Sequence, residues 1–329
     1  MTRLAGSVLL LLVIAALWQT LALARDERAH PPHGVFADAG GHKLRLLPSG
    51  GENAVPTVLL ETGIGGATSV TWSWVQRGVE RFAPVVSYDR AGMGCSEAGP
   101  MPRDGVELVT EFHTALVNAG FHGPYVFVGH SYGGLLARLF ADRYPDEVAG
   151  VVLVESSHAG QFRARGPRNV LRVMRALVPA SPWLARFGIM RAFIALIRTD
   201  ADLLPPAARS EQRAFLGSPR HWDGVVREMQ AWAPLTSPQA AAARGFGDRP
   251  LAVLIAETSA KRFPGWQGFQ RENAQLSTDS FIRTVAGSTH GSIIADSSHA
   301  EHVITAIHDV VDAVREHRRV ADLVSARGH

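Results

Sequence analysis

The chain has 329 residues, of which 46% are hydrophobic and 19% are charged, and its formal net charge is +3. This much apolar material excludes an intrinsically disordered chain, and the single cysteine, Cys95, excludes an internal disulfide and a cysteine-based zinc site. A nucleic-acid-binding protein would carry a dense stripe of lysine and arginine, which the small charge does not indicate, so we expect no nucleic-acid partner. The length predicts one large or two modest domains.

The N-terminal segment has the composition of a membrane-directed helix. Residues 4–24 carry no charge and are apolar on every face, which excludes an ordinary surface helix. Residues 1–24 are a signal peptide, cleaved after the small residues of Ala22-Leu23-Ala24, or a signal anchor, since 21 uncharged residues just suffice to cross about 30 Å of hydrocarbon. Both interpretations predict an exported or membrane-anchored protein with its catalytic domain outside the cytoplasm, and the anchor also predicts membrane association.

The polar, proline-rich residues 25–34 predict a tether, and an alternation of strands and helices follows it. Apolar and β-branched runs predict strands at residues 43–47, 57–60, 84–88, 125–128, 150–154, 251–256 and 281–285. Apolar residues at helical spacing predict helices at residues 72–82, 106–119, 135–144, 266–276 and 301–314. This order predicts an α/β fold with a mostly parallel central sheet and helices on both faces.

Residues 157–248 interrupt the alternation, because they contain helical patterns and no strand signal. We expect a helical cap inserted into an α/β core of residues 35–156 and 249–317, with residues 318–329 as a C-terminal tail. The cap helices carry apolar residues on one side and arginines on the other. The apolar side either packs on the core or contacts an apolar substrate or a bilayer surface, as basic amphipathic helices do.

A G-x-S-x-G motif, Gly129-His130-Ser131-Tyr132-Gly133, lies between a predicted strand and a predicted helix. A serine on a tight strand-to-helix turn needs glycine on both sides, because a side chain there would clash with the returning backbone. The turn would lift the Ser131 hydroxyl out of the carboxyl edge of the sheet, at a helix N-terminus that favours negative charge. Ser131 is therefore the candidate nucleophile, and a glycine-rich phosphate-binding turn is the competing interpretation.

A serine hydroxyl needs a base within hydrogen-bond reach. His290 follows the last predicted strand, on a loop that can reach back over the sheet edge where Ser131 emerges. His158 lies just past another strand and is the rival base, whereas His130 belongs to the turn itself and points away from the reacting atom. We expect His290 to be the base.

The base needs a carboxylate that fixes its tautomer and stabilises the imidazolium. Glu155 ends the strand at 150–154, and Glu257 ends the strand at 251–256. A glutamate at the end of a buried strand is costly without a partner, so both residues need an explanation. We favour Glu155 as the acid and keep Glu257 as the alternative.

A tetrahedral intermediate needs two N–H donors for its oxyanion. The amide of Tyr132, directly after the candidate nucleophile, is one candidate. The glycine-rich turn Thr62-Gly63-Ile64-Gly65-Gly66 supplies the other, and we expect it to be the Ile64 amide. These glycines could equally form a plain loop, and the two roles are compatible.

Taken in order, these pieces resemble the α/β-hydrolases over about residues 35–317. The matching segments are the Thr62–Gly66 turn, the D-R-x-G-x-G-x-S segment from Asp89 to Ser96, the G-H-S-Y-G-G turn and the G-S-T-H-G histidine loop. The D-R-x-G-x-G-x-S segment is similar to one in proline-iminopeptidase-like and esterase-like members. The resemblance implies that Asp89 and Arg90 support the loop beside the oxyanion turn.

The chain also departs from the family pattern. Thr62 stands where many members have histidine, and Glu257 stands where the usual aspartate follows the penultimate core strand. Some haloalkane dehalogenases place a glutamate where Glu155 lies, but they use an aspartate nucleophile. Ser131 at the nucleophile position therefore disfavours dehalogenases and epoxide hydrolases.

The pattern as a whole predicts a serine hydrolase that cleaves an ester-like acyl bond with a Ser131–His290–Glu155 triad and needs no cofactor or metal. The expected substrate is a small molecule, with an apolar acyl group because the cap is apolar. Two alternatives stay open: a proline-iminopeptidase-like peptidase, and a non-catalytic binding protein that kept the α/β-hydrolase fold. The cap shows no obvious acidic cluster for an α-ammonium group, which weakens the peptidase alternative.

Overall fold

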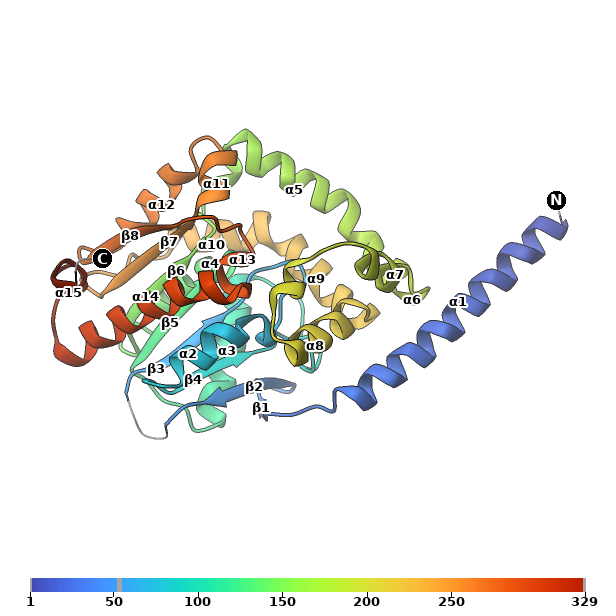
Figure 1. Cartoon of the computed structure of the whole chain (residues 1–329), viewed down its shortest axis with the longest axis horizontal. Coiled ribbons are helices and arrows are strands. Elements are labelled where there is room, and N and C mark those ends of the chain that lie inside the picture. Colours follow the sequence, from blue (N-terminus) through green and yellow to red (C-terminus); the bar gives the residue numbers. More distant parts are fainter. Residues whose placement is uncertain (1, 52–54, 328–329) are drawn as a thin grey trace.

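The structure is a computed structural model that describes residues 2–51 and 55–327, and an eight-stranded sheet lies at its centre (Figure 1). The strands are β1 (Val35–Asp38), β2 (Lys43–Ser49), β3 (Thr57–Glu61), β4 (Val85–Tyr88), β5 (Tyr125–His130), β6 (Val148–Val154), β7 (Leu251–Ala256) and β8 (Ser280–Val285). Their spatial order is β1-β2-β4-β3-β5-β6-β7-β8. The β1–β2 and β2–β4 pairs are antiparallel and the other pairs are parallel. The predicted α/β fold with a mostly parallel sheet is confirmed.

Helices surround this sheet and fill the segment between β6 and β7. The helices are α1 (Thr2–Ala29), α2 (Ser73–Val79), α3 (Gly105–Asn118), α4 (Gly133–Arg143), α5 (Arg165–Leu177), α6 (Ser181–Arg186), α7 (Ile189–Leu196), α8 (Pro206–Leu216), α9 (Pro219–Ala231), α10 (Ser237–Ala242), α11 (Glu257–Arg262), α12 (Trp266–Ala274), α13 (Ser292–Ala295), α14 (Ser297–Glu316) and α15 (Val320–Arg327). Shorter 3-10 helices are η1 (Ser69–Trp72), η2 (Gln161–Arg163), η3 (Val178–Ala180) and η4 (Asp200–Leu203), and η5 (Trp232–Thr236) is a π-helical turn.

The central strands are buried along nearly their whole length, and most of their residues are apolar, because both faces of the sheet are covered. In β5, Tyr125 and Phe127 pack with residues of α3 and α4 on one face. Val126 and Val128 pack with residues of α2 and α14 on the other face. Successive side chains of a strand point to opposite faces, so a strand between two helical layers carries apolar residues on both faces. This burial fixes the carboxyl edge of β5, where Ser131 follows.

Some segments differ from the sequence expectation. Residues 25–29 continue α1 instead of forming a tether. The short strand β1, which the sequence did not indicate, adds an antiparallel edge to β2. Residues 320–327, expected in a tail, form α15, because the carboxylate of Asp279 accepts hydrogen bonds from the Val320 and Ala321 amides and Val320, Leu323 and Val324 are buried.

The helices between β6 and β7 divide into two groups, which we call the outer cap (α5–α7) and the inner cap (α8–α10). Buried ion pairs attach the inner cap to the sheet. Arg45 of β2 pairs with Glu211 of α8 at 2.6 Å, and Arg90, just after β4, pairs with Glu228 of α9 at 2.9 Å. Glu61 of β3 is the second partner of Arg90, at 2.6 Å.

We expect the Arg90→Leu substitution to lower the free energy of unfolding by about 3–5 kcal/mol, because it leaves the buried carboxylates of Glu61 and Glu228 without their cation. Urea unfolding of the full chain measures this loss. Arg244→Leu is the matched control: Arg244 pairs with Asp142 at 2.6 Å but its side chain is 70% exposed, so its loss should cost about 0–1 kcal/mol. Equal losses in the two variants would contradict the expectation.

Candidate active site

Ser131 lies on a strained turn between β5 and α4. Its φ is +54°, a backbone conformation that non-glycine residues rarely adopt. A Cβ atom at Gly129 would lie 2.5 Å from the Gly133 carbonyl oxygen, and one at Gly133 would lie 2.5 Å from the Glu61 carbonyl oxygen. Both glycines are therefore required for the backbone to turn this sharply, as the motif predicts.

The structure brings Ser131, His290 and Glu155 together. His290 Nε2 lies 2.9 Å from Ser131 Oγ, and His290 Nδ1 lies 3.5 Å from Glu155 Oε1. The hydroxyl is buried with its residue, whereas the imidazole side chain is 51% exposed. The three groups thus form a continuous chain from a buried carboxylate through an accessible imidazole to a hydroxyl.

Glu155 is fully buried directly after β6, and its φ of +46° shows that its backbone is strained as well. The second carboxylate oxygen, Oε2, accepts a hydrogen bond of 2.7 Å from the Ala256 amide. Burial raises the pKa of Glu155, but the interactions with His290 and the hydrogen bonds from Ser259 and Ala256 outweigh burial and lower it overall. The site therefore holds Glu155 as a carboxylate beside the imidazole.

The two competing residues of the sequence analysis have other partners. Glu257 begins α11, where its carboxylate accepts from the Gly287 amide at 3.0 Å and pairs with Lys261 at 2.9 Å. These two contacts lower the pKa of Glu257. His158 pairs with Glu272 at 3.2 Å and stacks on Phe269. Neither residue is placed beside the Ser131–His290 pair.

His130 positions the His290 loop. Its Nε2 donates a hydrogen bond of 2.8 Å to the His290 carbonyl oxygen, while its ring is buried. Burial and the nearby His290 ring lower the pKa of His130 to about 3, so this imidazole stays neutral. Thr289 and Ser292 exchange two further hydrogen bonds across His290, at 2.8 and 3.1 Å. These bonds fix the backbone from which the His290 ring reaches Ser131.

Arg90 shapes the turn that carries Ile64. Its guanidinium donates to the Thr62 carbonyl at 2.9 Å and to the Gly63 carbonyl at 2.7 Å. With both carbonyls bound on the Arg90 side, the turn passes beside the nucleophile: a Cβ at Gly63 would lie 3.5 Å from Ser131 Oγ. Tyr132, directly after Ser131, is the N-cap residue of α4. Tyr132 and the turn that carries Ile64 therefore both adjoin Ser131.

Two pockets meet at this site. One, of about 330 Å³, is lined by residues of the inner cap and α7; the other, of about 270 Å³, is lined by residues of α5, α12 and the β6–η2 loop. Ile64 and His290 line both pockets. Most of the other lining side chains are apolar, among them Met190, Phe193, Ile194, Leu216, Phe162, Leu171, Met174 and Trp266.

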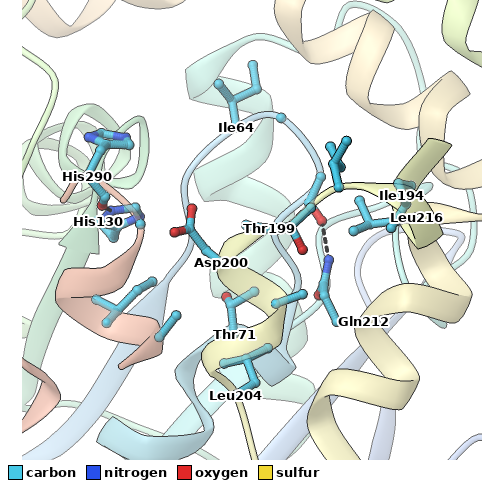
Figure 2. Close-up of a pocket in the computed structure, with 18 of the residues that line it drawn as sticks. Ile64, Thr71, His130, Ile194, Thr199, Asp200, Leu204, Gln212, Leu216 and His290 are labelled. Atoms are coloured by element: carbon cyan, nitrogen blue, oxygen red, sulfur yellow. Dashed lines mark hydrogen bonds between the residues drawn. The ribbon is translucent and has the colours of Figure 1, made fainter. Parts of the chain in front are cut away.

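Asp200 is a carboxylate in the first pocket that the sequence analysis missed. It begins η4, and Figure 2 shows it between His290 on one side and Ile194 and Leu216 on the other. Burial raises the pKa of Asp200, and the charge interaction with His290 opposes the rise. No motif marks this residue, because a cap turn brings it to the pocket from a distant part of the sequence. In the described residues, no cluster of three or more His, Cys, Asp or Glu side chains is arranged to hold a metal ion.

Known sequences resemble part of this chain, and the matched region with defined bounds contains Ser131 and Glu155 but not His290. The family profile described as the alpha/beta hydrolase fold matches residues 56–187. The chain is 35% identical over 106 residues to an AB hydrolase superfamily protein of Gibberella zeae, which covers 31% of this chain and 33% of that protein. The chain spans about a fifth to two fifths of the length of the first curated relatives that it matches.

Solved structures share the whole fold at low sequence identity. An esterase from Thermogutta terrifontis is 19% identical, with a TM-score of 0.61 over 86% of this chain and 99% of that chain. An epoxide hydrolase from Bacillus megaterium is 12% identical, with a TM-score of 0.67 over 84% of this chain and 100% of that chain. The sheet order, the family profile over residues 56–187 and these neighbours agree, and the chain has the α/β-hydrolase fold.

Proposed function

We propose that this protein is a serine hydrolase that cleaves a carboxylic ester through an acyl-enzyme. The observation that carries the proposal is the 2.9 Å contact between Ser131 Oγ and His290 Nε2 at a strained, glycine-flanked turn. Strain at a non-glycine residue persists where the surrounding structure enforces it, and such residues cluster at active sites. Glu155, 3.5 Å from the other ring nitrogen, supplies the orienting carboxylate.

The proposed reaction has two halves. Ser131 Oγ attacks the ester carbonyl while His290 Nε2 takes the hydroxyl proton, and the amides of Ile64 and Tyr132 bind the resulting oxyanion. The intermediate collapses, and His290 gives the proton to the departing alcohol. Water then attacks the acyl-enzyme with His290 as base, which releases the carboxylic acid and restores Ser131. Glu155 stabilises the imidazolium in both halves.

The two pockets support an ester with apolar groups on both sides of the scissile bond. They meet at Ile64 and His290, where the carbonyl carbon would lie. One pocket can then hold the acyl chain while the other holds the alcohol. On the apolar composition of α1, we place the catalytic domain outside the cytoplasm, either exported or membrane-anchored.

We expect a fluorophosphonate probe to label the wild-type protein covalently and the Ser131→Ala variant not at all, because only a serine activated by a base reacts with the probe. Mass spectrometry locates the label, and turnover of short esters is measured in parallel. Ser325→Ala, at an exposed position of α15, is the control and should label normally. An unlabelled wild type would favour the non-catalytic binding protein, and undiminished turnover by Ser131→Ala would rule out this mechanism.

Glu155→Gln should lower kcat by about 10⁴ without unfolding the chain. The amide oxygen of glutamine can keep the hydrogen bond from Ala256, so its NH2 group faces His290 Nδ1. Nδ1 must then accept, which places the proton on Nε2 and prevents it from taking the Ser131 proton. Glu257→Gln, which faces Gly287 and Lys261, is the control and should cost less than about tenfold. The reverse ranking would assign the acid to Glu257.

Asp200 favours a second candidate function, a proline-iminopeptidase-like peptidase, because a pocket carboxylate near His290 can bind an α-ammonium group. If substrates are peptides, Asp200→Asn should raise the KM for aminoacyl anilides about tenfold or more, about 1.4 kcal/mol of binding, and leave neutral esters unchanged. Steady-state kinetics on both substrate classes measures the difference. Equal effects on anilides and esters would remove the support for the peptidase.

A further inference from the structure

The second half of α1 is fitted to the cap. Gln19, which lies in the uncharged segment of α1 and is only 2% exposed, donates a hydrogen bond of 2.7 Å to the Gly217 carbonyl and accepts one of 3.1 Å from Arg191 of α7. Arg191 also pairs with Asp26 of α1 at 2.6 Å. A Cβ at Gly188 would lie 2.4 Å from the Trp18 ring, so the ring needs a glycine there. These contacts hold α1 and the cap together as one unit.

The first half of α1 projects away from the protein (Figure 1). Only 6% of the apolar window within Ala5–Ala29 is buried inside the structure, and side chains such as Leu9, Leu10 and Leu11 are exposed. By length and composition this helix can cross a membrane. A helix buried in the protein core would not leave these side chains uncovered, so the exposed half fits a hydrocarbon environment.

The free half of α1 is too short to cross the bilayer alone. The uncharged residues between Arg3 and Trp18 number 14, which corresponds to about 21 Å of helix, whereas the hydrocarbon core is about 30 Å thick. The missing length, about 9 Å, falls on residues 18–23, which lie along the cap. If α1 spans the membrane, the cap surface beside these residues enters the bilayer boundary by about 5–10 Å, the depth of interfacial helices.

The outer cap has the surface that such an environment favours. Its exposed apolar residues are Val170, Val173, Leu177, Trp183, Leu184, Ile189, Phe193, Leu196 and Ile197. Leu196 is 85% exposed and Trp183 is 64% exposed. Residues 156–199 contain eight arginines and no aspartate or glutamate. Arg186 stacks on the Trp183 ring at 4.6 Å, which brings a cation and an interfacial aromatic side chain together.

We infer that the outer cap docks on the surface of an anionic phospholipid bilayer, with α1 retained beside it as a membrane-spanning anchor. The exposed apolar side chains of α5–α7 enter the acyl boundary, and the arginines of α5 contact lipid phosphates. Phe193 and Ile197 of this surface, together with the buried Ile194, also line the pocket next to His290. The docked face therefore forms the wall through which an acyl chain in the bilayer reaches the pocket. The docking is independent of the proposed ester hydrolysis.

The test uses the full chain in vesicles of phosphatidylcholine and phosphatidylglycerol, with an environment-sensitive fluorophore on a single cysteine. In a Cys95→Ser background, the label is placed by Leu196→Cys on the outer cap, Leu10→Cys on α1 or Val117→Cys on α3. All three positions are exposed. Doxyl-labelled lipids quench a fluorophore in the bilayer, and iodide quenches one in water. We expect the lipids to quench the labels at residues 196 and 10 several-fold more than the label at residue 117.

The charge requirement gives a second readout. Omitting phosphatidylglycerol, or combining Arg168→Gln, Arg172→Gln and Arg175→Gln, should reduce lipid quenching at residue 196 several-fold and leave quenching at residue 10 unchanged. The proposal would be overturned if iodide quenches the label at residue 196 as strongly as the label at residue 117. A residue 196 label shielded from both quenchers would overturn it too, because another protein surface would then cover the cap. So would an intact mass that lacks residues 1–24.

Discussion

The site depends on how one buried guanidinium is held. Arg90 is buried, and its guanidinium donates hydrogen bonds to the carboxylates of Glu61 and Glu228. It also donates to the carbonyls of Thr62 and Gly63. Removing a cation from water is costly, and only this complete set of partners offsets the cost. The same atoms thereby join three parts of the molecule: the end of β3, the turn that carries Ile64, and α9 of the inner cap. The contacts that neutralise the buried Arg90 guanidinium therefore also position the turn that carries Ile64. They position the part of the pocket wall formed by α9 as well.

The two residues that contact opposite nitrogens of the His290 imidazole both have a strained backbone. Ser131 and Glu155 both have positive φ values, and both follow neighbouring parallel strands. The Ser131 amide donates to the Val154 carbonyl at 3.1 Å, and the Ser157 amide donates to the Ser131 carbonyl at 2.8 Å. The sheet register thus locks the two turns together. The His290 ring, on the loop after β8, can therefore contact Ser131 and Glu155 at the same time from one position. The hydrogen bond from His130 to the His290 carbonyl fixes the backbone for that position.

The fold could be predicted to a large extent, because its long apolar strands and amphipathic helices carry strong local patterns. The glycines around Ser131 and the position of His290 were also readable, since a sharp turn restricts residue type and strand ends share one edge of the sheet. Contacts between distant segments could not be predicted from the sequence. Glu228 lies 138 residues from Arg90, and no sequence pattern near either residue indicates that they form an ion pair. Asp200 has no motif, α15 depends on a cap from Asp279, and the choice between Glu155 and Glu257 depends on side-chain direction, which strand position alone does not specify.

The unequal attachment of the two cap groups has a consequence for motion. The inner cap is attached to the sheet by the buried pairs of Arg45 and Arg90, whereas α5 of the outer cap has a single buried residue, Leu171. A helix with little buried surface opens at a lower free-energy cost, so we expect α5 to move more readily than the inner cap. This helix can then move away from the second pocket while the Arg90 contacts stay closed. Gating and preorganisation are thereby separated in one domain: the gate can yield while the oxyanion turn keeps its shape.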